Sequence, residues 1–138
     1  MDFNSEVNEE YASHIKKLSE KIMEWLSEGL GLRHEALKEG LGGETIEYLM
    51  KINYYPPCPD PELVVGAPDH TDVNGITLLV ANEALGLQAF KDNQWIDAEY
   101  TTSGIIVIIG DQFLVRNLWT QETMLKSFNV SIMVGYCV

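Results

Sequence analysis

The chain has 138 residues, enough for about one domain, and a formal net charge of −12. So acidic a chain is a poor ligand for nucleic acid or for an anionic membrane surface, because both require an excess of Lys and Arg. The two cysteines, Cys58 and Cys137, make no disulfide framework, and the first residues form no apolar leader. We therefore expect a cytoplasmic protein that binds neither nucleic acid nor a membrane.

The first 45 residues predict helices. Apolar side chains recur at steps of three and four over residues 7–30, which is the spacing of one face of an α-helix. A second, short helix is predicted over residues 35–41. Gly42 and Gly43 should close it, because glycine adopts the backbone conformations that end helices.

From residue 46 the pattern changes to short β-strands separated by Pro, Gly and Asn. Asp92-Asn93 is a hairpin turn signal between two of these strands. The continuous apolar run Ile105–Ile109 is typical of a fully buried strand. Helices followed by short strands favour a helix pair packed against a sandwich or a barrel. The predicted strands cover residues 48–55, 76–80, 87–90, 95–97 and 105–109.

The tripeptide His70-Thr71-Asp72 is the strongest candidate for chemistry. Side chains two residues apart on an extended backbone point the same way, so His70 and Asp72 can meet one cation. An imidazole and a carboxylate, with a second imidazole from elsewhere, form the facial triad of non-haem Fe(II) oxygenases. Taken alone the tripeptide is a weak signal, because a surface turn accommodates the same residues.

The motifs around the tripeptide give it a context. In chain order they are Lys51-Ile52-Asn53-Tyr54-Tyr55-Pro56-Pro57-Cys58-Pro59, His70-Thr71-Asp72, Gly75-Ile76-Thr77-Leu78-Leu79, Gly86-Leu87-Gln88, Trp95 and Gly110-Asp111-Gln112. This order resembles the core of the plant 2-oxoglutarate/Fe(II)-dependent dioxygenases, and within them flavonol synthase and anthocyanidin synthase most of all. The resemblance covers about residues 5–114.

The resemblance implies a fold and an activity. The implied fold is α+β, with N-terminal helices packed on a partial double-stranded β-helix, a jelly roll that is incomplete here. The implied activity is oxidation of a flavonoid, such as a dihydroflavonol to a flavonol, coupled to oxidative decarboxylation of 2-oxoglutarate. Fe(II) is the implied metal, 2-oxoglutarate the co-substrate and ascorbate a further cofactor of the family.

The resemblance also assigns roles to individual residues by their place in the motifs. His70 and Asp72 correspond to two iron ligands. Asn53 and Tyr55 correspond to residues that bind 2-oxoglutarate, and Lys51 to one that faces the flavonoid. Ordinary strand and turn roles remain open for Asn53 and Tyr55, as does a solvated strand position for Lys51. No further catalytic side chain is assigned.

The chain departs from the family pattern near residue 114. The family has a second histidine downstream, followed by an Arg-x-Ser whose guanidinium binds the far carboxylate of 2-oxoglutarate. Here His70 is the last histidine, and Arg116 is the only later arginine and is not part of an Arg-x-Ser. We expect three segments: residues 1–45, helical; 46–114, a partial oxygenase core; and 115–138, a non-family tail from a frameshift, intron read-through or alternative exon.

These departures lead to expectations about activity and association. The family's N-terminal part has no counterpart here either, so the chain is expected to be truncated at both ends and to have little or no turnover. Three functions stay open: a flavonol-synthase-like enzyme, a non-catalytic product and an interaction partner of an intact relative. Strand edges left exposed by an incomplete jelly roll predict self-association. Alternating residues over 128–134 predict a strand that covers one such edge.

Overall fold

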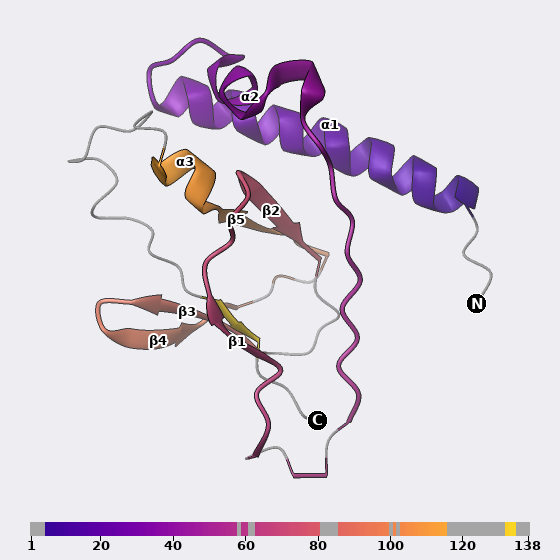
Figure 1. Ribbon diagram of the computed structural model, residues 1–138, viewed down its shortest axis with the longest axis vertical. Helices are drawn as coiled ribbons and strands as arrows, with labels where there is room; N and C mark the ends of the chain where they lie inside the picture. Colours follow the sequence, from indigo (N-terminus) through magenta and orange to yellow (C-terminus); the bar gives the residue numbers. More distant parts are fainter. Residues whose placement is uncertain are drawn as a thin grey trace. The chain divides into compact units, whose positions relative to one another are not determined.

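The computed structural model describes residues 5–57, 59–60, 63–80, 86–99, 101, 103–115 and 132–134. The chain divides into two compact units, Met1–Ile52 and Asn53–Val138 (Figure 1). The first unit is helical, and the second contains every strand that the structure describes. Helices followed by strands give the α+β class that the sequence predicts. In the described ranges, no helix is both long enough and apolar enough to cross a membrane.

The helical unit confirms both predicted helices. It consists of α1 (Ser5–Gly29), α2 (Ala36–Leu41) and a short 3-10 helix, η1 (Gly43–Thr45). Gly42 and Gly43 end α2 with φ values of 124° and 63°. This left-handed backbone region is open to glycine because glycine has no Cβ.

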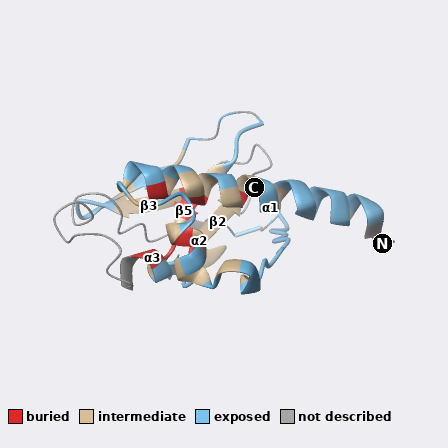
Figure 2. Cartoon of the chain, turned by 90° about the horizontal axis from the view of Figure 1, so that it is seen from above, coloured by how far each residue is buried: buried red, intermediate tan, exposed pale blue. Residues whose placement is uncertain are grey.

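A buried serine joins the two helices. The Ser27 hydroxyl donates a hydrogen bond to the Met23 carbonyl at 2.8 Å, and the Leu37 N–H donates to Ser27 Oγ at 3.3 Å. That N–H lies in the first turn of α2, where it has no partner within the helix. Met23, Ser27 and Leu37 are all buried, so Ser27 satisfies a donor that water does not reach. In Figure 2 the N-terminal half of α1 is, by contrast, mostly exposed.

Charged side chains connect the same elements at the surface. Lys38 lies 3.2 Å from Glu20 on α1 and 2.9 Å from Glu44 on η1. Hydrogen bonds to Glu44 and then to Glu20 raise the pKa of Lys38, and the bond to Lys38 lowers the pKa of Glu44. The Tyr48 hydroxyl donates to Glu20 Oε1 at 3.1 Å. These exposed or half-buried contacts add modestly to stability, because water screens them.

The second unit contains two antiparallel sheets within its described residues. One has the strand order β1-β6-β3-β4 and the other pairs β2 with β5. Leu87 and Ile108 form a buried core between the two sheets, with Leu79, Ala98 and Ile106 packed against them. The elements are β1 (Ala67–His70), β2 (Ile76–Leu79), β3 (Leu87–Lys91), β4 (Gln94–Asp97), β5 (Ile106–Ile109), α3 (Asp111–Val115) and β6 (Ile132–Val134).

The predicted hairpin is confirmed. Asp92 and Asn93 join β3 to β4 with φ values of 52° and 61°, as a tight hairpin of this kind requires. Phe90 and Trp95 face each other across the hairpin, with ring centroids 5.0 Å apart. The strands predicted over 76–80 and 105–109 are also present, as β2 and β5.

The strand predicted over residues 48–55 is wrong. Residues 46–57 have no regular secondary structure, and no described strand pairs with them. Leu49 is 92% exposed and Tyr54 is 81% exposed. The residue types suit a strand, but a strand forms only where a neighbour supplies the ladder of hydrogen bonds.

One of two further predictions about the strands needs correction. The run 105–109 is not fully buried: Ile108 is, but Val107 is 41% exposed, because successive side chains point to opposite faces and only the face of Ile106 and Ile108 packs in the core. The strand predicted over residues 128–134 is present over the described residues Ile132–Val134 as β6, and it covers an edge of each of its two neighbours. It lies between β1 and β3 and pairs with both. The rest of residues 116–138 lies outside the described part of the chain.

Candidate metal site

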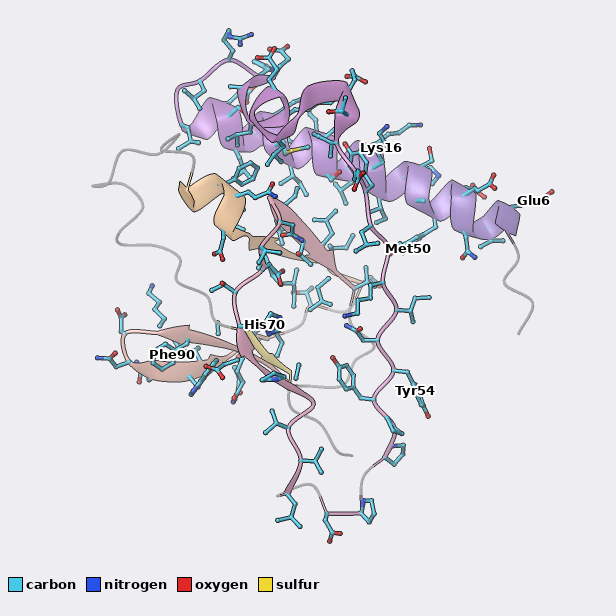
Figure 3. All side chains as sticks on the ribbon, viewed as in Figure 1. Glu6, Lys16, Met50, Tyr54, His70 and Phe90 are labelled. Carbon is cyan, nitrogen blue, oxygen red and sulfur yellow. The ribbon has the colours of Figure 1, made fainter. Side chains whose placement is uncertain are left out.

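His70 and Asp72 lie side by side where β1 ends. His70 is the last residue of β1 (Figure 3). Its Nε2 lies 3.7 Å from Asp72 Oδ1. A divalent metal lies about 2.1 Å from a ligating nitrogen or oxygen, so two ligands of one ion are at most about 4.2 Å apart. The His70 side chain is 45% exposed and the Asp72 side chain 18%. The two atoms can therefore contact one cation without a change of rotamer, and the site remains open to solvent.

A backbone carbonyl fixes the orientation of the histidine. The His70 Nδ1 lies 2.8 Å from the Pro68 carbonyl oxygen. A carbonyl only accepts hydrogen bonds, so Nδ1 carries the proton and Nε2 of the neutral ring keeps its lone pair. Metal-binding histidines are commonly held by such a bond from the other ring nitrogen. The nitrogen that faces Asp72 is thus the one able to bind a metal.

A hydrogen bond to its second oxygen, Oδ2, also fixes the orientation of the Asp72 carboxylate. The Thr77 hydroxyl, on β2, donates to Asp72 Oδ2 at 2.5 Å. The Asn74 side-chain amide donates to Thr77 Oγ1 at 2.9 Å. Oδ2 is therefore engaged by the protein, while Oδ1 faces the imidazole of His70.

The loop that carries Asp72 is fastened to the start of α3. Three successive backbone N–H groups donate to carbonyl oxygens of the loop, two of them at short distances. The bonds run from Gly110 to Gly75 at 2.8 Å, from Asp111 to Asp72 at 2.7 Å and from Gln112 to Asn74 at 3.2 Å.

A side-chain hydrogen bond and a glycine at position 110 also contribute to this attachment. The Thr71 hydroxyl donates to Asp111 Oδ2 at 2.7 Å. A Cβ at position 110 would lie 2.1 Å from the Asn74 carbonyl oxygen, so only glycine allows the two backbones to approach this closely. The position of Asp72 therefore depends on residues some 40 positions further along the chain.

Among the described residues, no third candidate ligand joins His70 and Asp72. Within the described ranges, no group of three His, Cys, Asp or Glu side chains could hold an ion. His14 and His34 belong to the helical unit, where they face Glu10 and Glu28. Strand β6, whose Ile132 is in register with His70, contributes only apolar residue types beside β1.

The residues predicted to bind the co-substrate and the flavonoid lie on the irregular segment 46–57. Asn53 and Tyr55 are exposed and belong to the second unit, whereas Lys51 is exposed and belongs to the first. Within the described part of the second unit, the structure gives no hydrogen bond from Asn53 or Tyr55 to His70 or Asp72. Sequence analysis assigned no role to Asn74, Thr77 or residues 110–112. Thr77 and residues 110–112 nevertheless belong to motifs that carry the family resemblance.

Comparison with known proteins gives a consistent family assignment. The sequence profile of the 2OG-Fe(II) oxygenase superfamily matches residues 46–127. A flavonol synthase/flavanone 3-hydroxylase of Arabidopsis thaliana is 68% identical over 109 residues, which are 79% of this chain and 32% of that protein. A flavonol synthase/flavanone 3-hydroxylase of Matthiola incana is 59% identical over 125 residues, which are 91% of this chain and 42% of that protein.

A solved structure matches as well. It is the crystal structure of JOX2 in complex with 2OG, Fe and JA, with a TM-score of 0.75 and 37% sequence identity. The match covers 94% of this chain and 37% of that one. The chain thus spans between about a third and two fifths of the length of these proteins.

Proposed function

Because the chain belongs to the 2OG-Fe(II) oxygenase superfamily, we propose that His70 and Asp72 are two of the protein ligands of its Fe(II). One observation carries the proposal: Nε2 and Oδ1 face each other at 3.7 Å, and a hydrogen bond to a neighbouring group holds each of the two side chains. An imidazole with a carboxylate is a donor set that suits Fe(II). Iron bound there, together with 2-oxoglutarate, supplies the oxidising chemistry of the family.

The proposed reaction is oxidation of a flavonoid, dihydroflavonol to flavonol, with 2-oxoglutarate as co-substrate. The support is the 68% identity with a protein named flavonol synthase/flavanone 3-hydroxylase. The two sheets would then form part of a double-stranded β-helix, with the core of Leu87 and Ile108 between its layers. A cytoplasmic location is part of the same proposal.

The exposed segment around residue 53 is proposed to meet the small molecules. The Tyr55 hydroxyl and the Asn53 amide can donate hydrogen bonds to the carboxylate of 2-oxoglutarate. The Lys51 ammonium can bind hydroxyl groups of a flavonoid. These roles need the segment to approach the metal ligands.

The 138 residues by themselves are proposed to turn over slowly or not at all. They contain neither a histidine after His70 nor an Arg-x-Ser. Two protein ligands retain a labile divalent metal less well than three. The arginine of the family's Arg-x-Ser, whose guanidinium binds the far carboxylate of 2-oxoglutarate with two hydrogen bonds, is missing as well.

Metal titration of the purified chain tests the site. Mn²⁺ replaces Fe(II), which air oxidises, and isothermal titration calorimetry measures the affinity. We expect one weak site that His70→Ala and Asp72→Ala each remove. The matched control is His34→Ala, which removes an exposed histidine of the helical unit and should leave binding unchanged. Equal binding by all four proteins would refute the proposed ligands.

A turnover assay tests the second part. The chain is incubated with Fe(II), 2-oxoglutarate, ascorbate and a dihydroflavonol, and both succinate and flavonol are measured. We expect a signal no greater than that of the His70→Ala variant. Clear turnover that this substitution abolishes would show that the chain is complete enough for catalysis.

A further inference from the structure

We infer that Thr77 is a positioning residue for the metal ligand Asp72: it engages one carboxylate oxygen and leaves the other as the single oxygen available to the cation. This inference rests on the proposed metal site and adds to it how the carboxylate binds and which ions it favours.

The direction of the hydrogen bonds determines which way the threonine hydroxyl points. The side-chain amide of Asn74 donates to Thr77 Oγ1 at 2.9 Å, and an amide nitrogen has no acceptor site. The threonine oxygen therefore acts as acceptor toward Asn74. Its only proton is directed to Asp72 Oδ2, at 2.5 Å.

Both ends of this chain of hydrogen bonds are fixed by backbone. Thr77 belongs to β2 and is paired with Ile108 of β5. The Asn74 carbonyl accepts a bond from Gln112, and the Asp72 carbonyl one from Asp111. The hydroxyl therefore cannot follow the carboxylate if the carboxylate rotates, so rotation breaks the bond to Oδ2.

The arrangement favours binding through one oxygen. Oδ1 faces His70 Nε2 at 3.7 Å, whereas Oδ2 is occupied by a short hydrogen bond to a side chain behind it. The Asp72 side chain is only 18% exposed, so water competes little for that bond and its strength is retained.

This geometry has a consequence for metal selection. Ca²⁺ takes six to eight oxygen ligands and readily binds both oxygens of a carboxylate. Ions such as Fe(II) and Mn²⁺ accept an imidazole nitrogen together with one carboxylate oxygen. By holding Oδ2, Thr77 disfavours Ca²⁺ relative to the transition metals.

The test measures Mn²⁺ and Ca²⁺ affinities of the full chain by calorimetry. Thr77→Val keeps the shape of the side chain but removes the hydroxyl. We expect its Mn²⁺ affinity to fall about 10- to 100-fold, the usual effect of removing a hydrogen-bond partner of a metal ligand. Its Ca²⁺ affinity should fall less or rise, so the ratio of the two affinities changes. Thr77→Ser restores the hydroxyl and should restore both the Mn²⁺ affinity and the ratio.

Two further variants separate this role from a general effect on the fold. Thr101→Val makes the same chemical change at an exposed threonine and should leave both affinities unchanged. Asn74→Ala leaves Thr77 in place but frees its hydroxyl to rotate, and should weaken Mn²⁺ binding several-fold. Circular dichroism shows whether Thr77→Val folds. If it does not fold, the Mn²⁺ affinities of Asn74→Ala and Thr77→Ser decide whether Thr77 positions Asp72.

The outcomes distinguish this inference from the proposed function. If the unsubstituted chain binds Mn²⁺ no better than His70→Ala does, the proposed metal site is wrong, and this inference with it. If the chain binds Mn²⁺ through His70 but Thr77→Val binds both ions as the unsubstituted chain does, only this inference is overturned. It is also overturned if Thr77→Ser is as weak as Thr77→Val.

Discussion

Replacing Gly110 with alanine should damage both the fold and the metal site, because the new methyl group has no room. The added Cβ would lie 2.1 Å from the carbonyl oxygen of Asn74 and 2.6 Å from its side-chain oxygen. A carbon and an oxygen need more than about 3 Å, so the two backbones must separate by about 1 Å. The φ angle of Gly110 is not positive, so the cause is steric and not conformational.

The cost follows from the bonds that this separation strains. Three backbone hydrogen bonds join residues 110–112 to residues 72–75, and each contributes about 1 kcal/mol. Overpacking in a tight region costs about 1–3 kcal/mol. We therefore expect Gly110→Ala to lower the free energy of unfolding by about 2–3 kcal/mol, a large part of the roughly 5–15 kcal/mol of an ordinary domain.

Urea unfolding followed by circular dichroism measures this loss, and calorimetry measures the Mn²⁺ affinity of the same variant. The matched control is Gly29→Ala at the end of α1, where an added Cβ meets nothing within 4 Å. The control should be as stable as the unsubstituted chain and should bind Mn²⁺ equally well. A Gly110→Ala variant with unchanged stability and affinity would refute the proposed attachment of the Asp72 loop to α3.

Three further predictions concern the helical unit and the sheet edge. The pKa of Glu44 lies below its usual 4.5 because of Lys38, so this pair stabilises the fold above that pH and is lost as pH falls through the folded value. Unfolding of Lys38→Met should therefore depend less on pH over the acidic range. Ser27→Ala leaves a buried N–H unsatisfied and should cost about 1–3 kcal/mol in urea unfolding. Val107→Lys adds a charge to β5 and should reduce concentration-dependent association in sedimentation velocity.

Matched substitutions serve as controls for these three predictions. Lys17→Met removes an exposed lysine that has no ion pair in the described part of the chain, and its pH dependence should match that of the unsubstituted protein. Ser13→Ala, on the exposed face of α1, should cost little. Val64→Lys adds the same charge outside the strands and should leave association unchanged. Each prediction fails where a variant behaves as its control does.

Local signals predicted the elements that local interactions form. The helical spacing over residues 7–30 and the Asp92-Asn93 turn both specify structure within a few residues, and α1 and the β3–β4 hairpin are present. The strand over 48–55 failed because pairing depends on a distant partner. The position of β6 between β1 and β3 likewise depends on which neighbours are available and not on its own alternation.

The candidate site likewise combines a feature that local spacing predicted with contacts that depend on distant residues. The spacing of His70 and Asp72 was sufficient to predict that they lie together, because Asp72 follows the end of β1 at His70 by only two residues. The contacts of Thr71 with Asp111 and of Asp72 with Thr77 could not be predicted, because they arise from a loop geometry that no periodicity encodes. The resemblance drew attention to their motifs without giving them a function.

The most direct test of the proposed metal site locates a bound metal within the chain. Mn²⁺ broadens the NMR signals of nearby amides, so a titration of ¹⁵N-labelled protein reveals which residues surround the ion. We predict selective broadening at residues 68–77 and 110–112, and its loss in the His70→Ala variant. Broadening centred on His14 or His34 of the helical unit, or unchanged by His70→Ala, would contradict this prediction.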